Sequence, residues 1–106
     1  MPSGSGDFSI GSEVWSGTSK LIEELGELQQ VLGKLIATHG RTEHWSGDLR
    51  EKLVEEIGDV LAAAQFFQDK NLSDEERRRI AERAVTKLGL FNYWQANPRM
   101  PGDEAR

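Results

Sequence analysis

Three stretches of the chain place apolar residues three and four positions apart, which is the spacing of one face of an α-helix. They predict helices from residue 18 to about 38, from 49 to 71, and from 73 to about 97. The expected buried positions are Leu21, Leu25, Leu28, Leu32 and Leu35, then Leu49, Leu53, Ile57, Val60, Ala64 and Phe67, and finally Ile80, Ala84, Leu88 and Phe91. We therefore predict an all-α fold, a helical bundle of three main helices that is completed by oligomerisation.

Two of the predicted helices have clear start signals. Asp48 followed by Glu51, and Ser73 followed by Glu76, have the spacing of a capping box, in which each residue bonds a free backbone N–H group of the first turn. Acidic residues in a first turn also interact favourably with the positive end of the helix dipole. We expect the second and third helices to begin at these positions.

Gly40 is the expected stop of the first helix, and the polar residues 41–47 are predicted to form a loop. Residues 12–97 should form one helical domain. A flexible N-terminus, residues 1–11, would precede it, and a polar C-terminal tail, residues 98–106, would follow it, beginning with the helix-breaking Pro98 and Pro101.

Composition narrows the classes of function. With 18 acidic and 13 basic residues the net charge is −5, which argues against binding of a nucleic-acid polymer. The absence of cysteine excludes disulfides and thiolate metal sites. Because no apolar run approaches a membrane span or signal peptide, we expect no membrane association and a cytoplasmic location. A chain of 106 residues has a small core, so we also expect a homodimer or homotetramer.

The most informative feature is an internal repeat. Residues 20–28, KLIEELGEL, match residues 52–60, KLVEEIGDV, with an identical or conservative residue at every position. Helices joined by a short loop usually pack antiparallel, so the two copies should face each other. The repeat predicts a site built from two similar halves.

Each copy carries two acids three positions apart, Glu24 with Glu27 and Glu56 with Asp59, on one side of its helix beside the predicted seam. Four converging carboxylates repel one another and require cations. Mg²⁺ or Mn²⁺ would suit them, because these hard ions prefer oxygen ligands and bind phosphate oxygens. The simpler interpretation is that the acids only solvate the flank of a bundle, but a duplicated block favours a site.

Gly26 and Gly58 occupy the centre of the two acidic pairs. A glycine inside a helix costs about 1 kcal/mol relative to alanine. We expect the missing side chains to let the helices, or a ligand, approach closely where the acids converge.

These residues resemble the MazG-type all-α nucleoside triphosphate pyrophosphatases, which are marked by an E-x-x-E pair followed by E-x-x-D. The pairs Glu24/Glu27 and Glu56/Asp59 match this pattern, and the resemblance covers roughly residues 18–94. It implies that the four acids are metal ligands and catalytic residues for hydrolysis between the α- and β-phosphates. The products would be a nucleoside monophosphate and pyrophosphate. Some small phage members of the family act on dGTP, so the resemblance favours a purine deoxynucleotide, in a bacterial cell or in the host cytoplasm of a phage.

The same resemblance makes Lys87 and Asn92 the nearest match to a phosphate-binding segment of the family. Lys20 and Lys52 lie one turn before the acids, where they would contact phosphates or balance the local charge. Trp15 is a candidate for stacking on a base, and so are Phe8, Trp45 and Trp94, although packing in the core or at a subunit interface is the better explanation for each.

Several other polar residues have structural explanations. Either Glu23 or Glu55 would serve as an extra metal ligand or as a base for the attacking water. The alternative is that both are exposed residues on the flank of the bundle. His39 and His44 lack a partner at metal-ligand spacing, so we expect them in a loop or at a helix end. The arginines at 77–79 are interpreted as a solvated face.

Two rival interpretations remain. One is a non-catalytic helical interaction module with a structural metal site. The other is a di-iron bundle, which the absence of an E-x-x-H pair disfavours.

Overall fold

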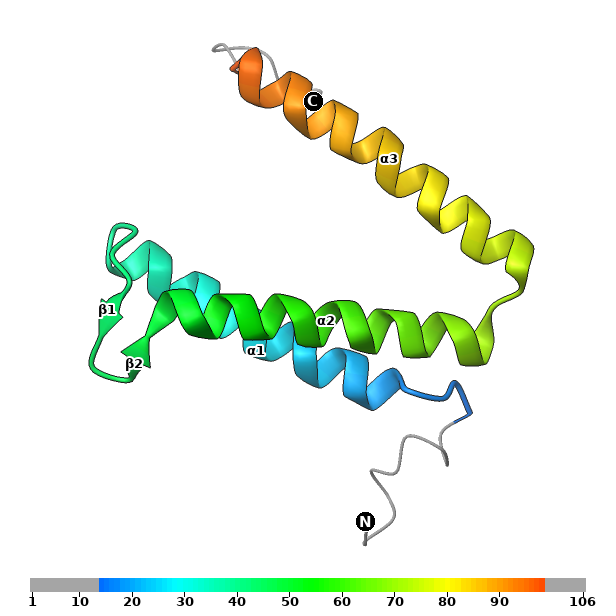
Figure 1. Cartoon of the computed structure of the whole chain (residues 1–106), viewed down its shortest axis with the longest axis horizontal. Helices are drawn as coiled ribbons and strands as arrows, with labels where there is room; N and C mark the ends of the chain where they lie inside the picture. Colours follow the sequence, from blue (N-terminus) through cyan, green and yellow to red (C-terminus); the bar gives the residue numbers. More distant parts are fainter. Residues whose placement is uncertain (1–13, 99–106) are drawn as a thin grey trace, which may run out of the picture. The chain divides into compact units, whose positions relative to one another are not determined.

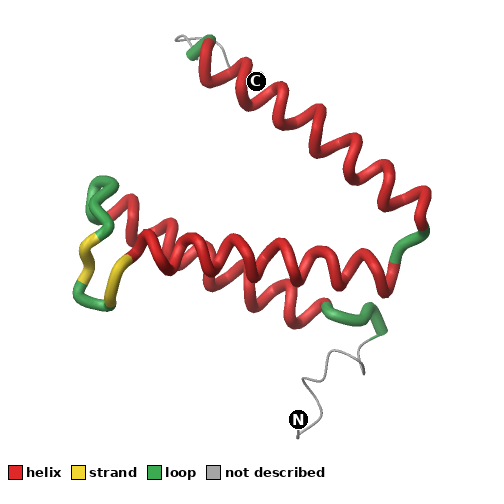
Figure 2. Tube along the Cα trace, viewed as in Figure 1, coloured by secondary structure: helices red, strands yellow, loops and turns green. Residues whose placement is uncertain are grey.

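The computed structural model describes residues 14–98 of the chain. Its fold is all-α with three helices, as predicted (Figure 2). The elements are α1 (Thr18–Ala37), β1 (Glu43–His44), β2 (Gly47–Asp48), α2 (Leu49–Asn71) and α3 (Asp74–Ala96). The chain divides into two compact units, Met1–Leu72 and Ser73–Arg106, and each is described by itself. Among the described residues, no helix combines the length and apolar character that crossing a membrane requires.

Helices α1 and α2 form the first unit, in which they pack side by side and run antiparallel (Figure 1). At one end of the pair, the Asn71 side chain donates a hydrogen bond to the Ser16 carbonyl oxygen at 2.8 Å. The Trp15 ring stacks on Phe67 at the same end, with ring centroids 6.2 Å apart. These contacts fix the start of α1 against the end of α2.

His39 and Gly40 form the motif that ends α1. The Gly40 N–H group donates to the Leu35 carbonyl oxygen at 2.7 Å, and that of His39 donates to the Ile36 carbonyl oxygen at 3.1 Å. This pairing is the Schellman motif, with His39 in the left-handed conformation at φ 56°. Helix α1 ends at Ala37, close to the predicted end at about residue 38, so the stop signal expected at Gly40 is confirmed and His39 lies just after the helix end.

A short hairpin replaces part of the predicted loop. Glu43 pairs with Asp48, and His44 pairs with Gly47, in antiparallel register. The prediction of an irregular loop was wrong at these positions, because two-residue strands are too short to show an alternating pattern. Lys52 of α2 donates to the carbonyl oxygen of Ser46 at 2.7 Å, which ties the hairpin to the helix that follows.

Asp48 caps α2, as predicted. Its side chain accepts a hydrogen bond at 2.9 Å from the backbone N–H group of Arg50, the second residue of the helix, whereas a capping box uses the third. Leu49, the first helical residue, is fully buried, so α2 is anchored where it leaves the hairpin.

The contact face of each helix differs from the predicted stripe. In the structure it runs through Leu21, Glu24, Leu28, Val31 and Leu35 of α1, and through Leu49, Leu53, Glu56, Val60, Ala63 and Phe67 of α2. Leu25, Leu32 and Ile57, which were predicted to be buried, are each 44% exposed. The prediction was wrong at these three positions and held at most of the others. Each helix carries two overlapping stripes with this spacing, and the charged positions were assumed to lie outside the contact.

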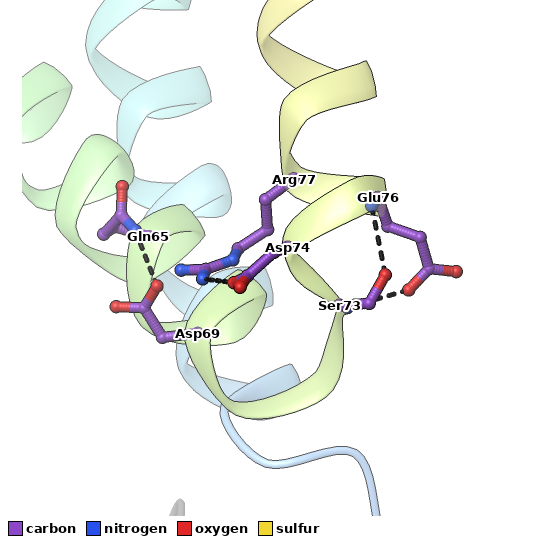
Figure 3. Close-up of polar contacts among 6 residues, drawn as sticks. All are labelled: Gln65, Asp69, Ser73, Asp74, Glu76 and Arg77. Atoms are coloured by element: carbon purple, nitrogen blue, oxygen red, sulfur yellow. Dashed lines mark hydrogen bonds and ion pairs between the residues drawn. The ribbon is translucent and has the colours of Figure 1, made fainter.

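The second unit contains α3, which starts at a complete capping box (Figure 3). The Ser73 hydroxyl accepts from the Glu76 N–H group at 3.1 Å, and the Glu76 carboxylate accepts from the Ser73 N–H group at 2.9 Å. The hydrogen bond from the Ser73 backbone, followed by that from its side chain, lowers the pKa of Glu76 below its ordinary value. Arg77 pairs with Asp74 in the same turn and is half-buried, whereas Arg78 and Arg79 are exposed, as the predicted solvated face requires.

The predicted apolar stripe of α3 is exposed along its length. Ile80, Ala84, Leu88 and Phe91 all lie on the surface of the described chain, so their expected burial was wrong for this unit taken alone. A long helix without a covered apolar face is rarely stable by itself, because helical stability in proteins comes mostly from packing.

Candidate metal centre

The four predicted acids converge at the middle of the helix pair. Each of Glu24, Glu27, Glu56 and Asp59 offers a carboxylate oxygen, and these oxygens all lie within 4.8 Å of one another. Glu24 and Glu27 come from α1, and Glu56 and Asp59 come from α2. The two copies of the repeat thus contribute one acidic pair each, as the antiparallel arrangement predicted.

The geometry leaves two oxygens of this cluster without a partner. The Oε1 atoms of Glu24 and Glu56 are buried, and neither has a hydrogen-bond partner among the described residues. The Glu24 side chain is only 15% exposed. Buried acceptors without a partner are unfavourable, and a cation bound by the carboxylates would satisfy them. The donor set contains only oxygen, which fits a hard divalent ion, so this acidic cluster could bind a metal.

The electrostatics of the cluster are consistent with the need for a cation. Burial raises the pKa of Glu24 above its ordinary value, and the charges of Glu27 and Asp59 raise it further, while Lys20 acts in the opposite direction. Burial also raises the pKa of Glu56, again with Glu27 and Asp59 as the next causes. When no cation is present, the carboxylates of Glu24 and Glu56 therefore bind protons more readily than a glutamate side chain in water does.

The two lysines of the repeat have different contacts. The Lys20 ammonium lies 2.6 Å from a Glu23 carboxylate oxygen and 3.9 Å from one of Glu24, so the charge-balancing contacts expected of it are present. Lys52 donates to the Ser46 carbonyl oxygen instead. A contact between either lysine and a phosphate stays a prediction.

The two glycines of the repeat do not mark a close approach between helices. A Cβ atom added to Gly26 or Gly58 would meet no atom within 4 Å among the described residues. The expectation that their missing side chains let α1 and α2 approach was wrong, because both glycines point away from the contact face. Their role toward a ligand stays a prediction.

The remaining substrate-binding candidates belong to the start of the first unit, to the second unit, or to residues outside the described range. Trp15 is half-exposed and stacked on Phe67. Lys87 and Asn92 belong to α3 in the second unit, where the Lys87 ammonium lies 5.5 Å from the centre of the Phe91 ring. Phe8 lies outside the described residues. Substrate binding by these residues stays a prediction.

Sequence reasoning missed a recess next to the acids. It has a volume of about 310 Å³ and is lined by Lys20, Glu24, Asp59, Ala62, Ala63 and Phe66. The signal was present in the spacing, since Phe66 follows Asp59 by seven residues, or two helical turns. Phe66 was passed over because its neighbour Phe67 fitted the core stripe.

Comparisons with protein-family models, with curated proteins and with solved structures found no match.

The raised pKa values predict how the stability of the metal-free protein depends on pH. Between the ordinary value of 4.5 and the raised values, the folded protein binds more protons than the unfolded chain, so stability falls as pH rises toward neutrality. Glu56→Gln removes one of these groups and should make the metal-free protein more stable than the wild type at pH 7. Urea denaturation in EDTA at several pH values above 4.5 would measure this.

The matched control is Glu51→Gln, at an exposed acid in the first turn of the same helix. Its loss should slightly destabilise the protein, because the negative charge favours the helix dipole. If Glu56→Gln and Glu51→Gln lost the same stability, the carboxylates of the cluster would not repel one another measurably.

The open space at Gly26 predicts that Gly26→Ala stabilises the protein by about 1 kcal/mol, since alanine is the better helix former. Gly17→Ala should do the opposite, because Gly17 has φ +89° and an added Cβ would lie 2.8 Å from the Phe66 ring. Denaturation midpoints of the two variants would measure both effects. A destabilising Gly26→Ala would mean that this face of α1 is covered in solution.

Proposed function

We propose that this protein is a metal-dependent nucleoside triphosphate pyrophosphohydrolase, which converts a nucleoside or deoxynucleoside triphosphate to the monophosphate and pyrophosphate. The observation that carries the proposal is the convergence of four carboxylates from two copies of one sequence block, with two buried oxygens lacking partners. The MazG-like E-x-x-E and E-x-x-D pattern supports the same reaction.

In this proposal Glu24, Glu27, Glu56 and Asp59 hold Mg²⁺ or Mn²⁺. A bound cation of this kind neutralises triphosphate oxygens and favours ionisation of the attacking water. The carboxylates fix the position of that charge before the substrate arrives, which is the main electrostatic contribution that a protein makes to such a reaction. Glu23 and Glu55 lie exposed beside the cluster and would accept the proton of the water.

The substrate class follows from the resemblance. A purine deoxynucleotide such as dGTP is our first choice, and the enzyme would act in the cytoplasm, where such nucleotides are found. A non-catalytic helical interaction module with a structural ion is the alternative, because an acidic cluster of this kind can also bind a metal without catalysis.

We propose further that copies of this chain assemble as a homodimer or homotetramer through a second apolar stripe on the helix pair. The stripe consists of Ile22, Leu25, Leu32 and Ile36 on α1, and Val54, Ile57 and Leu61 on α2, all of them exposed. Contiguous exposed apolar residues of this kind mark interaction surfaces more often than free surface.

Turnover should be seen when the purified protein is incubated with a panel of ribo- and deoxynucleoside triphosphates and Mg²⁺ or Mn²⁺. Chromatography would identify monophosphate and pyrophosphate as products, and EDTA should abolish their formation. Glu56→Gln should lower kcat/KM at least about 100-fold, because loss of even an outer-shell partner of a metal ligand costs 10- to 100-fold.

Glu51→Gln, on the same helix but outside the cluster, should retain activity close to that of the wild type. Metal binding without turnover of any nucleotide in the panel would favour the structural-ion alternative. Release of a nucleoside diphosphate and phosphate would contradict cleavage between the α- and β-phosphates.

Assembly through the second stripe predicts that Leu32→Lys lowers the molar mass in solution, because a buried lysine without a partner opposes association. Gln30→Lys, an exposed position on another face of α1, should leave the mass unchanged. Light scattering coupled to gel filtration would measure both variants. A wild-type mass equal to that of one chain would contradict the proposed assembly.

A further inference from the structure

The recess beside the acidic cluster is continuous with it. Glu24 and Asp59 belong to both, so a group bound at the carboxylates extends directly into the recess. Lys20 also lines the recess, with its ammonium 3.9 Å from a Glu24 carboxylate oxygen, and the rest of the lining is Ala62, Ala63 and the Phe66 ring. The site therefore has a charged end and an apolar end, as a ligand with a charged and an aromatic part requires.

The length of the recess is set by the helix. Phe66 lies seven residues after Asp59, which corresponds to about 10 Å along α2. A nucleotide whose phosphates lie at the carboxylates would place its ribose beside the two alanines and its base at Phe66. The recess is open to solvent, and its volume of about 310 Å³ lies at the small end of ligand pockets, so a bound nucleoside would stay partly exposed.

Phe66 is held in place before any ligand binds. Gly17 in the turn before α1 approaches the ring so closely that a Cβ atom there would lie 2.8 Å from Cδ2. The Lys70 ammonium lies 5.4 Å from the ring centre. A fixed aromatic ring can contact a base with little loss of side-chain entropy on binding.

We propose that the nucleoside part of the substrate occupies this recess and that Phe66 is the residue that contacts the base. The proposal rests on the proposed function for the charged end of the ligand. It places the base contact on α2 rather than on Trp15, whose ring is stacked against Phe67 with an interplanar angle of 8°. Small side chains at Ala62 and Ala63 provide the space for the sugar.

The test compares Phe66→Leu with Phe67→Leu, a substitution of the same type at a neighbouring half-buried phenylalanine that does not line the recess. Phe66→Leu should raise the KM of the best nucleoside triphosphate about tenfold, the effect typical of losing one aromatic contact to a base. Phe67→Leu should change it less than about twofold. Mn²⁺ affinity, measured by titration without nucleotide, should be unchanged in both variants.

A second variant keeps the proposal testable if Phe66→Leu is poorly folded. Ala62→Leu adds a branched side chain at an exposed helical position that lines the recess. It should raise the KM for nucleotides but leave inhibition by inorganic tripolyphosphate unchanged, because tripolyphosphate occupies only the charged end. A structural defect would alter both.

The outcomes separate this inference from the proposed function. If the wild type hydrolyses nucleotides and neither Phe66→Leu nor Ala62→Leu raises the KM, the recess does not hold the nucleoside and the inference is wrong while the function stands. A raised KM in Phe67→Leu alone would assign the base to the Trp15 side and also overturn it. A wild type without turnover of any nucleotide overturns both.

Discussion

Mutual repulsion of four carboxylates in a helix seam is the constraint on which the rest of this structure depends. Glu24 and Glu56 occupy positions of the α1–α2 contact that an ordinary helix pair fills with apolar residues. Burial, followed by neighbouring charges, raises the pKa of both groups, so the charged form of each acid is less favourable here than in water. A sequence optimised only for stability would not place acids there twice, in the same nine-residue block. Such a placement favours a site over stability, since this cluster of four carboxylates could bind a metal ion.

This placement divides the helix pair into two unlike sides. Successive helical residues are about 100° apart, so Leu25 and Ile57 lie on one side of the seam acids, while Glu27 and Asp59 lie about 60° to the other. Because the two blocks are antiparallel copies, the equivalent residues of both helices fall on the same side of the pair. The exposed apolar stripe and the acidic recess thus lie on opposite sides. Assembly through the stripe would leave the recess open to solvent and substrate.

What the sequence could and could not predict follows from the range of each interaction. The Ser73–Glu76 capping box and the stop signal after α1 at Gly40 depend on residues close together in the sequence. Their spacing alone was therefore enough to predict them. The acidic cluster was predicted because the same nine-residue block occurs in both helices. Two copies on antiparallel helices indicate that their acids face each other, although they are far apart in the sequence. The sequence did not show that the contact face of α1 runs through Glu24 and not through Leu25. Both residues fit the helical spacing, and only packing against α2 decides which of them is covered. Phe66 was missed for the same reason, since its environment depends on Gly17 across the fold.

Contacts at the two ends of the helix pair explain how α1 and α2 stay packed although the four carboxylates between them repel one another. At one end Leu49 is fully buried and Lys52 ties α2 to the hairpin; at the other, Asn71 bonds the Ser16 carbonyl oxygen. These contacts fix α1 against α2 on either side of the acids and so hold the four carboxylates near one another. Phe66 belongs to the second of these ends and also lines the recess. The contact with Gly17 that orders this end of the pair therefore also shapes the recess, and a change in the Phe66 ring would affect both.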